Sequence, residues 1–267
     1  MAEPVSHLRG FTLQLGDGSH WWVGSMPAVS SWVEKLASML HLHPGTADGA
    51  NLMVFLEGNT PLERIKQLVA PESDWVPLNR KIKRLVTSDS GWIAWDNSYL
   101  RVWYGMDLPD LVVELKTPLS RNKGYDGIRF ALQFIFRQSL QRGGLPLHGA
   151  LVEHQGRGVL LVGTSGTGKQ AESQDSSSLA GIFFIEQSSS DECFPMAPSK
   201  ALIEIIIASQ IVLNIHLWYC DSEEARNIRA IMFDNACKLV HQVPAFHLRV
   251  SLTGRFWEQI ETALAGV

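Results

Sequence analysis

The feature that most constrains the fold of this 267-residue chain is a glycine-rich segment, Gly163-Thr-Ser-Gly-Thr-Gly-Lys169. It follows directly on an apolar run, Val159–Val162, which has the composition of a buried strand. A strand that runs into Gly-x-x-x-x-Gly-Lys is typical of a P-loop, because the glycines let successive backbone N–H groups point at one anion. The sequence therefore predicts an α/β fold built around this loop, with a nucleotide or another phosphorylated ligand bound there.

The candidate binding residues are those of the loop and the position after it. They are Gly163, Thr164, Ser165, Gly166, Thr167, Gly168, Lys169 and Gln170. Lys169 is expected to reach the β and γ phosphates of ATP or another nucleoside triphosphate, or a smaller phosphate ligand. Gln170 stands where the motif has Ser or Thr, whose hydroxyl ligates Mg²⁺. An amide oxygen on a longer side chain would place the ion elsewhere, so Mg²⁺ is doubtful and we assign no metal ligand.

The segment after the loop is short. Only Gln170–Ala180 separates the loop from the next apolar strand, Gly181–Glu186. A P-loop unit normally has a full helix there, followed by a strand ending in an Asp that holds Mg²⁺. Glu172 and Asp175 are the acids of this span, and their position favours solvated surface charges. The pair Asp191-Glu192, which follows the strand, is the alternative source of metal-binding acids if the chain folds back on the loop.

The spacing of apolar residues predicts an α+β protein whose chain has three parts. We expect a mixed α/β N-terminal domain over residues 1–124, a bridging helix within residues 125–145, and a P-loop domain over residues 146–267. In the first part we expect strands Phe11–Leu15, His20–Gly24, Leu52–Leu56, Trp92–Trp95, Tyr99–Tyr104 and Leu111–Leu115, and a helix from Ser30 or Ser31 to Leu40. The bridging helix is expected over Tyr125–Gln141. In the last part we expect strands His148–Glu153, Gly158–Val162, Gly181–Glu186 and Phe246–Ser251, and helices Ser199–Ile211, Ser222–Val243 and Arg255–Ala265.

Composition and charge indicate which partners the protein is expected to bind and which compartment it is expected to occupy. The net charge of −4 and the pI of about 6.1 give no global basic field for nucleic acid or an anionic membrane. Cys193, Cys220 and Cys237 form no CxxC pair, which is typical of a reducing cytoplasm and argues against a disulfide framework. The N-terminus lacks the apolar run of a signal peptide, and no stretch approaches the roughly 18 apolar residues of a membrane span. The oligomeric state is left open.

Two further residue groups allow a functional interpretation. The nine tryptophans, including Trp21, Trp22, Trp92, Trp95 and Trp103, either pack in the core or form a stacking surface for a peptide, and packing is the favoured alternative. His41 and His43 would share one face of a strand, but the sequence supplies no third metal ligand beside them.

The second half of the chain also resembles a known family. It is similar to the nucleotide-binding core of HPr kinase/phosphorylase, and more particularly to the SynChlorMet cassette protein C group, which is found beside radical-SAM peptide-maturation genes. The likeness covers about Leu147 to Ala265. It is carried by Leu147-His148-Gly149-Ala150, Gly156, Gly158–Lys169, Phe183–Gln187, Phe233–Cys237 and Val243–Leu248.

The resemblance implies roles for single residues. Lys169 matches the family's phosphate-binding lysine and His148 its active-site histidine. The family's acidic segment, with its catalytic aspartate, has no counterpart between Lys169 and Leu179, as though a block had been lost. Two hypotheses follow: a catalytically degenerate nucleotide- or phosphate-binding protein, or an active ATP-dependent kinase for a peptide or small molecule. The implied partners are a precursor peptide or radical-SAM maturation proteins.

Overall fold

The computed structural model describes residues 9–15, 18, 20–40, 42–45, 50–56, 76–77, 83–87, 92–96, 100–105, 110–116, 124–163, 178–219 and 222–266. The chain forms two compact units. The first, unit 1, comprises Met1–Ile135 with Trp218–Asp221, and the second, unit 2, comprises Phe136–Leu217 with Ser222–Val267. The division falls within helix α3, Gly124–Gln141.

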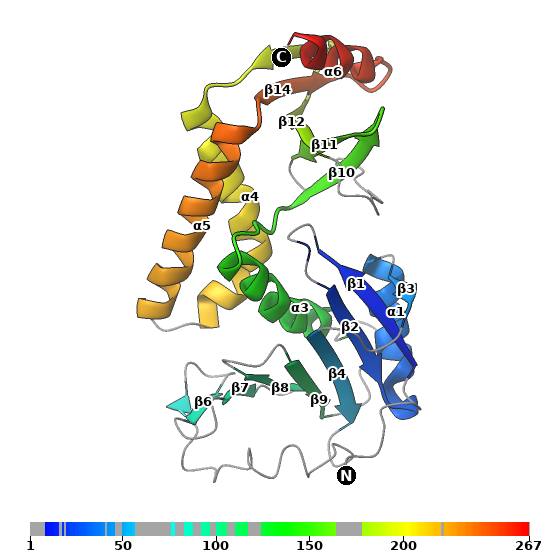
Figure 1. Ribbon diagram of the computed structural model, residues 1–267, viewed down its shortest axis with the longest axis vertical. Helices are drawn as coiled ribbons and strands as arrows, with labels where there is room; N and C mark the ends of the chain where they lie inside the picture. The colour runs from blue at the N-terminus through cyan, green and yellow to red at the C-terminus, as the bar shows by residue number, and fades with distance from the viewer. Residues whose placement is uncertain are drawn as a thin grey trace. The chain divides into compact units, whose positions relative to one another are not determined.

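Unit 1 is built on a mixed sheet (Figure 1). Among the residues described, its strand order is β3-β1-β2-β4-β9-β8-β7-β6-β5. The strands are β1 Arg9–Gln14, β2 His20–Ser25, β3 His43–Pro44, β4 Ala50–Leu56, β5 Val76–Pro77, β6 Lys83–Thr87, β7 Trp92–Asp96, β8 Leu100–Gly105 and β9 Asp110–Leu115. β4 runs parallel to both β2 and β9, and the other neighbours are antiparallel. A short 3-10 turn, η1 Pro27–Val29, leads into helix α1, Ser30–Leu40, which contacts β1 and β2.

The elements predicted for the N-terminal part are confirmed. β1 and β2 lie in the predicted ranges and form an antiparallel hairpin, with Phe11 opposite Val23, and α1 covers the predicted range. β3, β5 and β6 were not predicted. The first two have only two residues each, and two of the five residues of β6 are charged, so none has a clear apolar period.

Tryptophans fill the core of unit 1. Trp21, Trp22, Trp32, Trp95 and Trp103 are between 0% and 6% exposed. The ring of Trp95 packs against that of Phe134 from α3, with 4.6 Å between their centroids. The packing interpretation of these tryptophans is therefore confirmed.

Unit 2 has a second mixed sheet, with the order β10-β11-β12-β14-β13 in the described part of the chain. Its strands are β10 Gly149–His154, β11 Arg157–Val162, β12 Leu179–Gln187, β13 Glu192–Pro195 and β14 Ala245–Val250. β11, β12 and β14 are parallel, while the edge strands β10 and β13 are antiparallel to their neighbours. β10 and β11, both predicted as strands, form an antiparallel hairpin. Its turn has positive φ at Gln155 (53°) and Gly156 (75°), as a two-residue turn between twisted strands requires.

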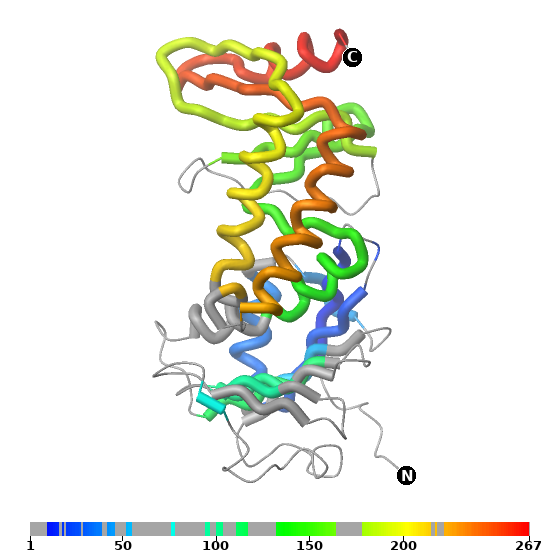
Figure 2. Tube along the Cα trace, turned by 90° about the vertical axis from the view of Figure 1, so that its left-hand side faces the viewer, coloured from blue at the N-terminus to red at the C-terminus, as the bar shows by residue number. Residues whose placement is uncertain are grey.

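Helices cover both faces of this sheet (Figure 1). Val162, Ile182 and Phe184 pack against Ala201 and Ile205 of helix α4, Pro198–Tyr219, and against helix α5, Ser222–Gln242. On the opposite face, residues that include Phe183 and Leu248 pack against helix α6, Phe256–Ala265. Figure 2 shows α4 and α5 running side by side along most of their length.

Helix α4 is longer than predicted. The sequence predicted Ser199–Ile211, whereas the helix continues to Tyr219. The helix is apolar on nearly every side. Because apolar and polar residues do not alternate with the helical period, the sequence gives no clear sign of where the helix ends. No described helix is both long and apolar enough to cross a membrane.

Candidate functional site

The candidate site lies where the parallel strands of unit 2 end. Because β11, β12 and β14 point the same way, their carboxyl ends meet at one edge of the sheet. Gly163 follows β11 directly and so begins the glycine-rich loop at this edge. Open α/β sheets bind their ligands at this edge, where loops and helix amino ends present backbone N–H groups. The fold thus places Gly163, the first residue of the glycine-rich segment, at the edge where open α/β sheets bind their ligands.

The rest of the predicted loop lies outside the described residues. This applies to Thr164, Ser165, Gly166, Thr167, Gly168, Lys169 and Gln170, and to the acids Glu172 and Asp175. Their assignment as a phosphate-binding segment stays a prediction from the sequence.

His148 is brought to the same edge as Gly163. In the β10–β11 ladder Gly149 pairs with Val162, so the residue before β10 lies next to the residue after β11. The His148 backbone N–H donates to the carbonyl of Ala208 on α4, at 3.3 Å. A Cβ at Gly149 would lie 2.8 Å from the Leu161 carbonyl oxygen, so only glycine allows this close pairing. The two sequence-predicted residues that the structure describes are therefore neighbours.

Asn235 holds the segment that leads to His148. Its side-chain amide donates to the carbonyls of Leu140, at 2.8 Å, and Gly144, at 3.0 Å. The first of these is among the last carbonyls of α3, which have no partner within the helix. Gly143, between the two, has a φ of 92° that favours glycine. Asn235 belongs to the motif Phe233–Cys237 that carries the family resemblance, but the sequence alone assigned it no role.

Glu186 is an acid that the sequence analysis overlooked. Val162 of β11 pairs with Phe184 of β12, so Glu186 lies two residues further along the strand next to the loop strand. Its carboxylate Oε2 lies 2.8 Å from His247 Nε2 of β14 and 3.8 Å from Arg249 Nε. The signal was present in the sequence, since Glu186 ends the predicted strand where a P-loop unit has its metal-binding acid.

Asp191 and Glu192 have other partners. Asp191 Oδ1 accepts the backbone N–H of Ser251 at 2.5 Å, and this hydrogen bond holds the pKa of the Asp191 carboxyl below its ordinary value of 3.8. Glu192 Oε2 lies 3.1 Å from Arg249 Nη1. Asp191, which precedes β13, is thus joined to Ser251, which follows β14. Glu192 of β13 is joined to Arg249 of β14. Within the described ranges, no three His, Cys, Asp or Glu side chains are grouped as metal ligands would be.

The lowered pKa of Asp191 predicts a small pH dependence of stability. A carboxyl whose pKa is depressed on folding stabilises the protein above the unfolded pKa, and this contribution is lost as the pH falls through the folded pKa. The melting temperature of the wild type should therefore fall more steeply than that of Asp191→Asn as the pH falls below the ordinary carboxyl pKa of 3.8. Asp234→Asn, at an exposed position of α5, should keep the wild-type slope. Parallel curves for the wild type and Asp191→Asn would contradict the assignment.

These features define a mixed α/β protein in which Gly163, the first residue of the glycine-rich segment, lies at the carboxyl edge of a set of parallel strands. Residues 111–174 and 169–265 match the family described as SynChlorMet cassette protein ScmC. The chain belongs to this family, as the resemblance indicated. No curated protein and no solved structure matches the chain. The family match comes in two stretches that overlap at residues 169–174, a segment that begins with Lys169.

Proposed function

We propose that this ScmC-family protein binds a nucleoside triphosphate, or another phosphorylated ligand, at Gly163–Lys169 and is catalytically degenerate. The observation that carries the proposal is the position of Gly163, directly after β11, on the edge where the parallel strands of unit 2 terminate. A glycine-rich loop leaving this edge can direct several N–H donors at one phosphate. Lys169 would add a point charge, and His148, next to Gly163, an imidazole donor.

The residues of the chain fit a phosphate better than they fit Mg²⁺. Gln170 replaces the hydroxyl that ligates the ion, and the sequence between Lys169 and Leu179 has no counterpart of the acidic segment. Phosphoryl transfer depends on positioning and on neutralising the charge that builds on the transferred oxygens. A protein that keeps the loop but lacks these groups would hold a nucleotide without turning it over.

The binding proposal is tested by titrating three ligands into the full chain by calorimetry: ATP, pyrophosphate and adenosine. If the loop recognises phosphate, ATP and pyrophosphate should bind with affinities within about tenfold of each other, since the same N–H groups and Lys169 hold both. Adenosine should give no heat at the same concentrations. Equal binding of adenosine and ATP, or no binding of pyrophosphate, would contradict the proposal.

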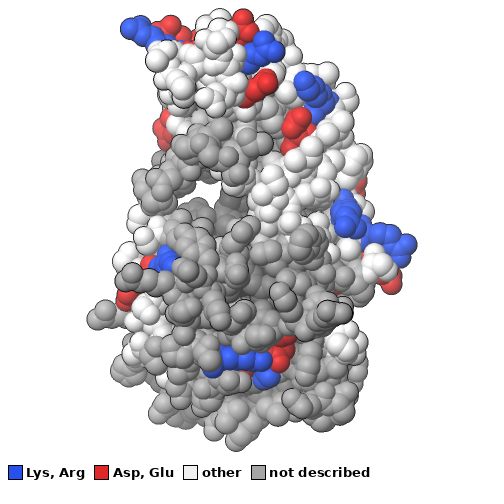
Figure 3. All heavy atoms as spheres, turned by 180° about the vertical axis from the view of Figure 1, so that it is seen from behind, with Lys and Arg blue, Asp and Glu red and all other residues white. Residues whose placement is uncertain are grey.

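The partners we propose follow from family membership. A cassette protein would act on or beside a precursor peptide or its radical-SAM maturation enzymes, in the cytoplasm. On the face drawn in Figure 3, the described Lys and Arg side chains are interspersed with Asp and Glu. The described residues on this face therefore do not form the continuous basic surface that nucleic acid selects.

One observation favours the second candidate, an active kinase for a peptide or small molecule. Glu186 lies one residue before the end of β12, the strand beside β11, and its carboxylate lies 2.8 Å from His247 Nε2 at the carboxyl end of the sheet. An acid in that position could take the place of the missing metal-binding or proton-accepting group. This alternative predicts ATP turnover that Glu186→Gln abolishes.

Restoring the hydroxyl alone should not create activity. Gln170→Ser supplies a Mg²⁺ ligand, but the acidic segment would still be missing, so release of the γ-phosphate should stay at the background of the wild type. The measurement is phosphate release from ATP with excess Mg²⁺. The control is the double variant with Ser165→Ala and Gln170→Ser, which has as many hydroxyl side chains in this segment as the wild type. Turnover in the unmodified protein would establish the kinase instead, and its loss in Glu186→Gln would identify the acid.

A further inference from the structure

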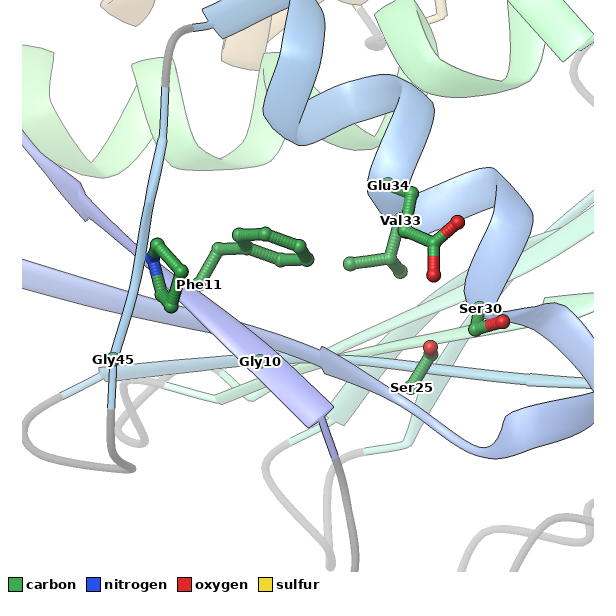
Figure 4. A pocket seen from close by; sticks show the side chains of 8 residues that line it. Gly10, Phe11, Ser25, Ser30, Val33, Glu34 and Gly45 are labelled. Atoms are coloured by element: carbon green, nitrogen blue, oxygen red, sulfur yellow. The ribbon is translucent and has the colours of Figure 1, made fainter.

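Unit 1 contains a pocket that none of the preceding functions uses. It lies between α1 and the strands β1, β2 and β3, and has a volume of about 380 Å³ (Figure 4). Cavities of roughly 300–1,000 Å³ are the usual size of small-molecule sites. The pocket is therefore large enough for a compact organic molecule.

One side of the pocket is polar. Ser25 of β2 is 3% exposed, and its hydroxyl has no hydrogen-bond partner in the described part of the protein. Figure 4 shows Ser25 projecting from β2 toward α1, beside Ser30, while Glu34 extends from α1 into the same space. Ser30 and Glu34 are four residues apart on the helix and so share one face. A buried hydroxyl without a partner is costly, so Ser25 favours a ligand that offers a hydrogen bond.

The other side is apolar. Phe11 of β1 extends its ring toward Val33 of α1, and Pro44 of β3 lines the pocket beside them. Val33 is 1% exposed. An aromatic ring and a proline ring offer flat surfaces against which a ligand's apolar body can pack.

The wall formed by β3 is held firmly in place. Phe11 pairs with Pro44 in the β1–β3 ladder, and the Gly45 N–H donates to the carbonyl of Gly10 at 3.2 Å. From below, the indole N–H of Trp22 donates to the carbonyl of Gly45 at 3.2 Å. A Cβ on Gly10 would lie 2.1 Å from Trp22 Nε1, so the indole packs directly beneath the pocket floor. The site is thus preorganised by the sheet and does not depend on a loose loop.

The geometry points to a binding site for a small ammonium compound with a flat apolar body. The ammonium has three donors, which match the oxygens of Ser25, Ser30 and Glu34. The apolar body would lie against Phe11 and Pro44, where the ring face also attracts a cation. Glu34 disfavours anions, so this ligand differs in charge from the phosphate proposed for unit 2. Binding here needs none of the residues of the glycine-rich loop.

The test uses three probes of similar shape and different charge on the full chain: 2-phenylethylamine, 2-phenylethanol and 3-phenylpropanoate. Dissociation constants are measured by ligand-observed NMR titration. The amine should bind with a dissociation constant of about 1–10 mM, as expected for so small a ligand. The alcohol should bind about tenfold more weakly and the carboxylate more weakly still, because only the amine pairs with Glu34.

Two variants make the assignment specific. Glu34→Gln, at an exposed position that tolerates the change, should weaken the amine about tenfold and leave the alcohol unchanged. Ser25→Ala should weaken both the amine and the alcohol about threefold to tenfold, because both donate to this hydroxyl. Glu153→Gln, the same charge change on the exposed side of β10 in unit 2, should alter neither. Equal affinities for the amine and the carboxylate, or unchanged amine binding by Glu34→Gln, would overturn the proposal.

Discussion

Replacing Asn235 by aspartate is expected to lower the free energy of unfolding by about 3–5 kcal/mol at neutral pH. Asn235 is 6% exposed, and its amide donates to two carbonyls, those of Leu140 and Gly144. An aspartate has the same shape but no donor, so it would place a buried negative charge against two carbonyl oxygens. The segment that leads from α3 to His148 would lose its anchor.

The pH dependence of this variant separates the charge from the shape. Burial beside two carbonyls should raise the pKa of the introduced carboxyl, and the protonated form can donate one hydrogen bond. Asn235→Asp should therefore recover part of its stability as the pH falls toward 5, whereas Asn235→Ala should not. The measurement is urea unfolding followed by circular dichroism. Asn227→Asp, at an exposed position of the same helix, should cost under about 0.5 kcal/mol. An equal cost at positions 235 and 227 would contradict the anchoring role.

Much of the secondary structure of unit 2 could be predicted from local patterns. The hairpin of β10 and β11 follows from two apolar strands with Gly156 in the turn, and β12 follows from the apolar run between Gly181 and Glu186. Such signals are carried by neighbouring residues, so a single sequence is enough to show them. β13 was missed because it has four residues, ends in Pro195 and depends on pairing with β14, more than 50 residues away.

The candidate site was harder to predict than the fold, because its parts meet only through strand pairing. His148 and Gly163 are neighbours because Gly149 pairs with Val162, and Glu186 and His247 meet because β12 and β14 are parallel and in register. The sequence shows an acid, an imidazole and a glycine-rich loop, but not which strands lie together. The role of Asn235 was hidden for the same reason, since its two carbonyl partners are about 90 positions away in the chain.

Lys169→Ala is expected to weaken ATP binding about tenfold to a hundredfold. One charge-assisted contact to phosphate is worth roughly 1.5–3 kcal/mol, and each 1.4 kcal/mol changes the dissociation constant tenfold. The backbone N–H groups of the loop would remain, so some binding should persist. Stability should change little if Lys169 acts on the ligand alone.

The most direct test of phosphate binding at this loop is a calorimetric titration of ATP into three proteins: the wild type, Lys169→Ala and Lys200→Ala. Lys200 is an exposed lysine in the first turn of α4, so its replacement removes the same charge from the same unit. We expect the wild type and Lys200→Ala to bind ATP equally and Lys169→Ala to bind at least about tenfold more weakly. Equal binding by all three proteins, or no binding of ATP by the wild type, would contradict the account.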